Sequence, residues 1–200
     1  MNLISTLAIA MGSAWVSGIN LYACVATLGL LSRFAHLPLP GDLQVVTSWW
    51  VIGIAAGLYV VEFVADKVPW VDSTWDVIHT FIRVPAGAVL AAGAFGDFDR
   101  SIQVVALLLG GSLALTSHGT KSATRAILNT SPEPVSNSIA SVVEDVVAIG
   151  STIVSVLFPV LIFFIIAAGL TVSFFLFRKI LRFFRQVRTR IQGWFAPATT

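Results

Sequence analysis

The densest group of charges in the chain is the stretch Val60-Val61-Glu62-Phe63-Val64-Ala65-Asp66-Lys67-Val68-Pro69-Trp70-Val71-Asp72-Ser73-Thr74-Trp75-Asp76. It places five ionisable side chains, a proline and two tryptophans between two segments that are otherwise almost pure hydrocarbon. Elsewhere the chain continues for tens of residues without a charge, so this density needs a physical reason. We interpret the stretch as the main polar hinge between two membrane segments.

The composition excludes an ordinary soluble domain. Apolar residues make up 56% of the chain and charged residues 11%, with a mean hydropathy of +0.89, whereas a soluble domain carries about 25% charged residues. Charge-free runs occupy Met1–Ser32, Leu43–Val61, Val84–Gly96, Ser101–Ser117 and Val146–Phe177. Several exceed the roughly 18–20 apolar residues that identify a membrane-spanning helix. The sequence predicts an all-α, polytopic membrane helix bundle, with one membrane domain over residues 1–180.

Six membrane segments follow from proline, glycine and charge positions. We expect them at about Leu3–Ser32, Leu43–Lys67, Ser73–Phe95, Ser101–Thr130, Val135–Ile149 and Ser151–Phe177. The first lacks the Lys/Arg region of a signal peptide and is expected to be retained. As one helix it would be about 45 Å long, against a hydrocarbon core of about 30 Å. It is therefore either tilted and longer than the bilayer, or broken at its polar middle, Ser17-Gly18-Ile19-Asn20.

The same order of features occurs twice along the chain. A long segment with a Ser/Gly interruption precedes a proline-containing loop, a Val-Val-Glu segment (Val60–Glu62, Val142–Glu144) and a segment with an early proline. We interpret this as a duplication, with repeat one at about 3–98 and repeat two at about 101–177, each with an interrupted first helix. Three crossings per repeat would invert the second copy, as in many transporters. If segments one and four are re-entrant hairpins, only four segments span and this argument fails.

The basic residues of the chain are unevenly placed. Six of them lie between Arg178 and Arg190, interleaved with Phe, Ile and Leu. This composition indicates a basic amphipathic tail over 178–200 that contacts the bilayer and its anionic lipid headgroups, and not nucleic acid. By the positive-inside rule the tail is cytoplasmic, at a bacterial inner membrane. Six spans would then place the N-terminus on the same side.

Two groups of polar side chains are candidates for an ion or substrate pathway. Glu62 and Asp66 are four residues apart and share a helix face, and Glu144 with Asp145 echoes them. Ionisable groups in membrane segments serve ion pathways, proton relays or pairing, so a cation or proton site and a structural ion-pair network both stay open. The second group surrounds the two polar interruptions and is Ser17, Asn20, Ser117, His118 and Lys121. It would hold an anion or a substrate carboxylate, or only hydrogen-bond helices together.

The remaining polar residues of the hinge have structural explanations. Asp72 or Ser73 is expected to cap the third segment, with Asp76 in its first turn. Pro69 ends the second segment, and Lys67 would offset the charge of Glu62 and Asp66. Arg83 is expected to pair with one of those carboxylates across the hairpin.

The sequence carries no enzyme or cofactor signature. It lacks His-Glu-x-x-His, a Walker loop, Gly-x-Ser-x-Gly and any Cys/His cluster, and its single cysteine, Cys24, lies in an apolar run. We expect no cofactor and leave a metal open. An intramembrane lipid enzyme built from Glu62, His118 and arginines stays as a minor alternative.

The pattern Val61-Glu62-x-x-Ala65-Asp66-Lys67-Val68-Pro69-x-x-Asp72-x-x-Trp75-Asp76, followed by Arg83-x-Pro85-Ala86-Gly87, resembles a family of small bacterial membrane proteins. That family is catalogued as domain of unknown function 4126. The polar interruptions at Ser17–Asn20 and Ser117–Lys121 fit it as well. The resemblance implies a multi-span inner-membrane protein and carries no catalytic assignment.

Three functions compete at this point. The first is a small transporter or channel for an ion or small solute, with a path lined by the broken segments and the carboxylates. The second is a lipid-headgroup-handling protein of the scramblase or flippase kind, and the third is a structural or accessory membrane protein. Small bundles of this kind often need a partner to enclose a path, so a homo-oligomer is also expected.

Overall fold

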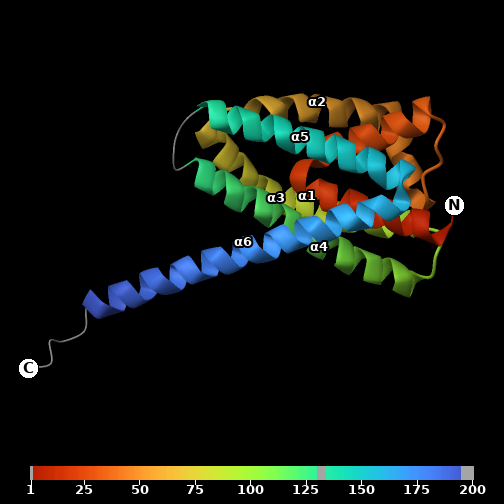
Figure 1. The fold of residues 1–200 in the computed structure, drawn as a ribbon. Helices are drawn as coiled ribbons and strands as arrows, with labels where there is room; N and C mark the ends of the chain where they lie inside the picture. Colours follow the sequence, from red (N-terminus) through yellow and green to blue (C-terminus); the bar gives the residue numbers. More distant parts are fainter. Residues whose placement is uncertain (1, 130–133, 195–200) are drawn as a thin grey trace, which may run out of the picture.

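The computed structural model describes the backbone of residues 2–129 and 134–194, and their side chains except at 69, 70, 73, 134 and 189–194. All regular secondary structure within these residues is helical. Its elements are α1 (Leu3–Phe34), the 3-10 helix η1 (Gly41–Thr47), α2 (Trp49–Ala65), α3 (Pro69–Ala94), α4 (Arg100–Leu128), α5 (Pro134–Leu157) and α6 (Pro159–Trp194) (Figure 1). The prediction of an all-α bundle is confirmed.

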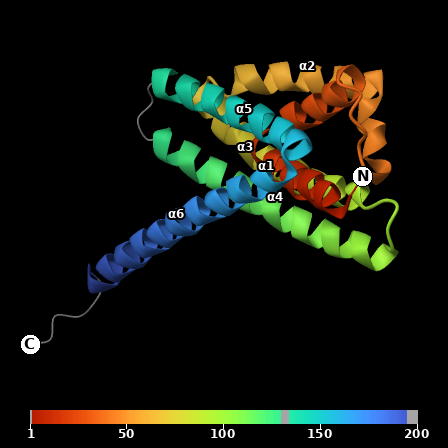
Figure 2. The ribbon, with the colours of Figure 1, turned by 45° about the vertical axis from the view of Figure 1, so that its right-hand side comes forward.

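Helix α1 is broken in its middle and folds back on itself. Asn20 has extended backbone angles (φ −149°, ψ 100°) inside the helix. The Cys24 Sγ lies 3.7 Å from the Ser13 carbonyl oxygen, although eleven residues of straight helix would separate these positions by about 16 Å. In both ribbon views the chain turns inside the bundle, and both ends of α1 lie on the side that holds the N-terminus (Figures 1 and 2). Of the two alternatives for this segment, the break is correct.

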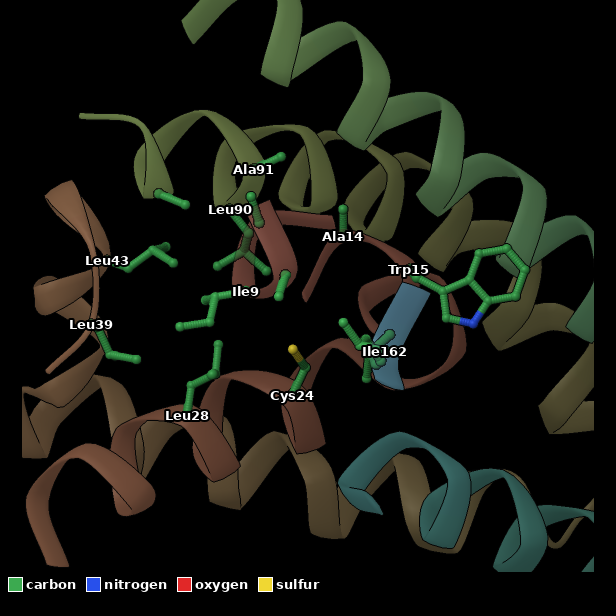
Figure 3. Close-up of a cluster of buried hydrophobic side chains, with 14 of the residues drawn as sticks. Ile9, Ala14, Trp15, Cys24, Leu28, Leu39, Leu43, Leu90, Ala91 and Ile162 are labelled. Atoms are coloured by element: carbon green, nitrogen blue, oxygen red, sulfur yellow. The ribbon is translucent and has the colours of Figure 1, made fainter. Parts of the chain in front are cut away.

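The α1 hairpin forms the centre of the molecule, because it packs against every other helix. Its two halves share one apolar core, in which Ile9 of the first half and Leu28 of the second are both fully buried (Figure 3). Leu43 of η1, Leu90 of α3 and Ile162 of α6 complete that core. The hairpin is thus enclosed by protein, as non-helical backbone at membrane depth has to be.

Helix α4 continues without a break, which corrects the second predicted interruption. It runs as one α-helix through Ser117-His118-Gly119-Thr120. The hydroxyls of Thr116 and Thr120 donate to carbonyls four residues back, 2.8 Å away. These bonds satisfy the two threonine hydroxyls within the helix, which keeps its hydrogen-bond pattern.

Two further boundaries differ from the prediction. Helix α3 begins at Pro69 after an extended Val68, because proline suits the first helical position. Asp72 and Asp76 therefore lie inside the helix and do not cap it, so that prediction was wrong. Helix α5 continues to Leu157, well past the expected end at Ile149, and α6 starts at Pro159.

The small residues of α3 are used within the chain. Ala91 is fully buried, and a Cβ placed on Gly110 of α4 would lie 2.8 Å from the Gly87 carbonyl oxygen. This close approach of α3 and α4 is the packing that small residues permit between membrane helices.

The chain is a multi-pass membrane protein by the length and composition of its helices. Candidate spans are α1, Thr74–Ala94 within α3, α4, Val135–Leu157 within α5 and α6; the pair η1 and α2, bent by 70°, gives a sixth. By these criteria the described residues contain five to six candidate crossings.

A bilayer-spanning α3 predicts the labelling of introduced cysteines on either side of it. Asp97→Cys, in the loop before α4, and Lys67→Cys, between α2 and α3, should react with a membrane-impermeant maleimide from opposite faces of sealed vesicles. Cys24 is fully buried and provides an unreactive background. Labelling of both positions from the same face would contradict a bilayer-spanning α3.

Candidate functional site

A network of nine ionisable residues lies between α2, α3, α4 and α5. The carboxylates of this charge network are Glu62, Asp66, Asp72, Asp76, Glu144 and Asp145, and its cations are Arg83, Lys121 and Arg125. All except Glu144, whose side chain is 17% exposed, are buried. Burial of charged side chains raises the free energy of a folded membrane protein unless the charges are paired, and such residues often serve a function.

The network residues of α3 and α4 lie on the facing sides of these two helices because of their spacing along the sequence. Asp72, Asp76, His79 and Arg83 of α3 follow one another at intervals of four, three and four residues, which places them on one face. Ser117, Lys121 and Arg125 form a matching stripe on α4, with His118 beside it, and all four are buried. The two stripes meet because α3 and α4 make the most extensive helix contact in the molecule.

Lys121 is the cation that the carboxylates share. Its Nζ lies 3.2 Å from Asp66 Oδ2, 3.4 Å from Glu144 Oε2 and 3.6 Å from Glu62 Oε1. It also donates to the Ile19 carbonyl oxygen at 3.3 Å, a carbonyl next to the break in α1. The ammonium group therefore links the two Val-Val-Glu segments to the α1 hairpin.

Arg83 pairs with Glu62, as predicted. Its Nη2 forms a short ion pair with Glu62 Oε1, and both side chains are fully buried. Its Nη1 lies 3.4 Å from Asp76 Oδ1 and 3.2 Å from His118 Nδ1. Since a guanidinium only donates, His118 Nδ1 accepts, which leaves the proton on Nε2.

The other ring nitrogen of His118 agrees with this assignment. Nε2 lies 2.7 Å from Thr80 Oγ1, and the Thr80 hydroxyl itself donates to the Asp76 carbonyl oxygen at 3.0 Å. His118 is therefore a neutral donor to Thr80 and adds no charge to the network. In the group predicted to hold an anion, His118 would therefore act through its hydrogen bonds and not through a positive charge.

Arg125 connects the charge network to α5. It donates from Nη2 to Glu144 Oε2 at 2.7 Å and from Nε to Glu144 Oε1 at 3.0 Å. Its Nη1 donates to Asn137 Oδ1 at 2.7 Å, and Asn137 in turn donates to the Asp66 carbonyl oxygen at 2.7 Å. Arg125 and Asn137 were absent from the predicted site, although Arg125 lies one helical turn beyond Lys121 on the same face.

The break in α1 contributes a polar contact of its own. The Asn20 amide nitrogen donates to Asp145 Oδ1 at 2.9 Å, and its oxygen accepts from the Ala23 amide at 2.9 Å. Ser117 donates to the Trp15 carbonyl oxygen at 2.7 Å, and Ser17 donates to the Ala14 carbonyl oxygen at 2.8 Å. The two Ser/Gly segments that the sequence singled out thus meet, and they lie beside the charge network.

The hinge residues Lys67, Asp72 and Pro69 have different roles in the structure from those that the sequence predicted. Lys67 stays outside the network, and its Nζ donates to the Phe63 carbonyl oxygen at 2.9 Å. Asp72 lies 4.0 Å from Arg125 and accepts from Asn129 at 3.2 Å, so it belongs to the network. Pro69 starts α3.

The network is reached from a cavity on the α3–α4 side. This cavity, of about 320 Å³, is lined by Asp76, Val77, Thr80, Ser122, Arg125 and Ala126. Ser122 donates to Asp76 Oδ2 at 3.0 Å. Two members of the network therefore border a space that continues to the surface of the bundle.

The network contains more carboxylates than cations, and some of its carboxylate oxygens lack a hydrogen-bond partner among the described residues. Six carboxylates face three cations, which leaves three negative charges when all are ionised. Glu62 Oε2 and Asp66 Oδ1 are buried without a hydrogen-bond partner among the described residues. Across the same residues, no group of three or more His, Cys, Asp or Glu side chains has an arrangement suited to a metal ion.

A family model described as domain of unknown function, DUF4126, matches residues 7–179. The chain belongs to this family. The match covers α1 to the first half of α6, and so includes the entire charge network of this DUF4126 protein. Searches of curated proteins and of solved structures gave no match.

Proposed function

We propose that the protein is a small transporter or channel for an ion or small solute, with the charge network as its site. The excess of three carboxylates over cations in the charge network carries the proposal. A purely structural network would gain by pairing each carboxylate, because unpaired buried charge costs several kcal/mol. A site for protons or cations instead requires carboxylates in excess of the resident cations. Such sites lie next to broken helices in transporters.

Two features of the fold support a path through this site. The re-entrant α1 brings the Ile19 carbonyl and the Asn20 side chain to Lys121 and Asp145, and such helix breaks provide backbone groups for transported species. The cavity at Asp76 and Arg125 gives access from the α3–α4 side.

We also propose that the fold arose by duplication with inversion. α2 and α5 run in opposite directions along the bundle, and so do α3 and α6 (Figure 1). Glu62 and Glu144 both reach Lys121. The first helices have diverged, since α1 is a hairpin and α4 is a single helix.

Flux measurements on proteoliposomes test the transport proposal. Proton and monovalent-cation flux, then flux of small solutes, should fall at least about tenfold in Glu62→Gln, which corresponds to a loss of only about 1.4 kcal/mol. Asp97→Asn is the matched control, because it removes an exposed carboxylate outside the network. Equal flux in wild type and Glu62→Gln, for every species tested, would contradict the proposal.

An apolar groove favours a second candidate, lipid handling. It measures about 330 Å³ and is lined by Leu21, Tyr22, Val25, Val51, Ile54, Ala55, Leu58, Ala86, Val89 and Leu90. The Tyr22 hydroxyl lies 3.1 Å from His79 Nε2, on the α3 stripe of the charge network. The same proteoliposomes, carrying a headgroup-labelled phospholipid, would show faster lipid exchange between leaflets if this candidate is correct.

A further inference from the structure

The second half of α6 extends beyond the other helices of the bundle (Figures 1 and 2). The helix has 36 residues, or about 54 Å, whereas Pro159 to Arg178 covers about 28 Å, close to the thickness of the hydrocarbon core. Phe177 packs at the crossing with α4, where a Cβ on Gly119 would lie 3.2 Å from its ring. Beyond this crossing α6 continues away from the other helices (Figures 1 and 2).

A cavity lies on this part of α6, next to the crossing. It measures about 460 Å³ and is lined by Phe174, Phe177, Arg178, Leu181, Arg182 and Arg185. The three arginines are spaced four and three residues apart, so they share one helix face. Guanidinium groups and apolar side chains therefore border the same space at the membrane boundary.

Among the described residues, these arginines have no acidic partner. No Asp or Glu follows Asp145 in the sequence, while six Lys or Arg do. The ion pairs of the described residues all lie within the charge network, and none includes an α6 cation. The side chain of Arg190, also in the predicted lipid-binding tail, lies outside the described residues.

We infer that this cavity is a binding site for an anionic phospholipid. The phosphate lies among Arg178, Arg182 and Arg185, because guanidinium groups bind phosphate oxygens in a bidentate manner. The acyl chains lie along Phe174, Phe177 and Leu181, toward the hydrocarbon core. The apolar half of the site commits it to a lipid, since free phosphate would leave these side chains without a partner.

Native mass spectrometry of the full chain in detergent tests this site, with phosphatidylglycerol, phosphatidylcholine and inorganic phosphate as separate probes. We expect wild type to retain phosphatidylglycerol in preference to phosphatidylcholine. Arg182→Gln/Arg185→Gln should weaken phosphatidylglycerol binding at least about tenfold. Each basic residue near an anionic lipid headgroup adds to the binding affinity, and this variant removes two of them. Lys179→Gln/Arg188→Gln removes the same charge from other faces of α6 and should retain binding.

Three results would overturn the site. Equal retention of both lipids would remove its selectivity for anionic headgroups. Equal losses in the two double variants would show diffuse attraction to a basic helix. Displacement of phosphatidylglycerol by millimolar inorganic phosphate would show that the acyl chains contribute nothing.

Discussion

Lys121→Met is expected to destabilise the protein by about 3–5 kcal/mol, the cost of removing one partner from a buried ion pair. Methionine fills a similar volume but leaves Glu62, Asp66 and Glu144 without the cation that lies within 3.6 Å of each. Thermal unfolding in detergent, followed with a thiol-reactive dye, gives a direct measurement. Cys24 is the only cysteine and is fully buried, so it reacts only when the bundle opens.

Two further variants show whether the loss comes from charge. Lys67→Met makes the same chemical change outside the network and should cost no more than about 1 kcal/mol, as for other partly exposed charges. Adding Glu62→Gln to Lys121→Met should recover part of the loss, because the two changes are coupled through one ion pair. Equal losses for Lys121→Met and Lys67→Met would mean that the network contributes no stability through Lys121.

Gly18→Ala is expected to have the second largest effect, with a loss of about 1–3 kcal/mol or more from overpacking. Its Cβ would collide with Ser117 Oγ and the Ala114 carbonyl oxygen and lie 2.8 Å from the His118 amide nitrogen. Two of these contacts are backbone atoms of α4, which cannot rotate away. The same thiol-dye assay applies, and the variant should also expose Cys24 at a lower temperature.

Gly57→Ala supplies the matched control for this substitution. A Cβ at Gly57 meets nothing within 4 Å, and alanine in a helix interior gains about 0.5–1 kcal/mol over glycine. The two identical changes should therefore shift stability in opposite directions. A Gly18→Ala protein as stable as wild type would show that the contact between α1 and α4 is not close.

The candidate site could be predicted only in part, for a reason that its residues make clear. Glu62, Asp66, Glu144 and Lys121 stand out in sequence because ionisable groups are rare in apolar segments. Arg125 and Asn137 carry the same signal, yet their roles depend on which helices face each other. Asp72 was assigned to a helix cap because local capping patterns favour that role, but Pro69 starts the helix one turn earlier and leaves Asp72 opposite Arg125.

The sequence by itself determined the helical membrane class, the family and most of the residues in the charge network. These follow from composition, the lengths of apolar runs and local motifs, all of which act within one helix. Tertiary structure alone decided that α1 turns back at Asn20 while α4 continues through Ser117 and Gly119. Both segments contain Ser and Gly, but the extended backbone of α1 lies at Asn20, whose side chain donates to Asp145 of α5. That contact spans 125 residues, and no local pattern in the sequence specifies it.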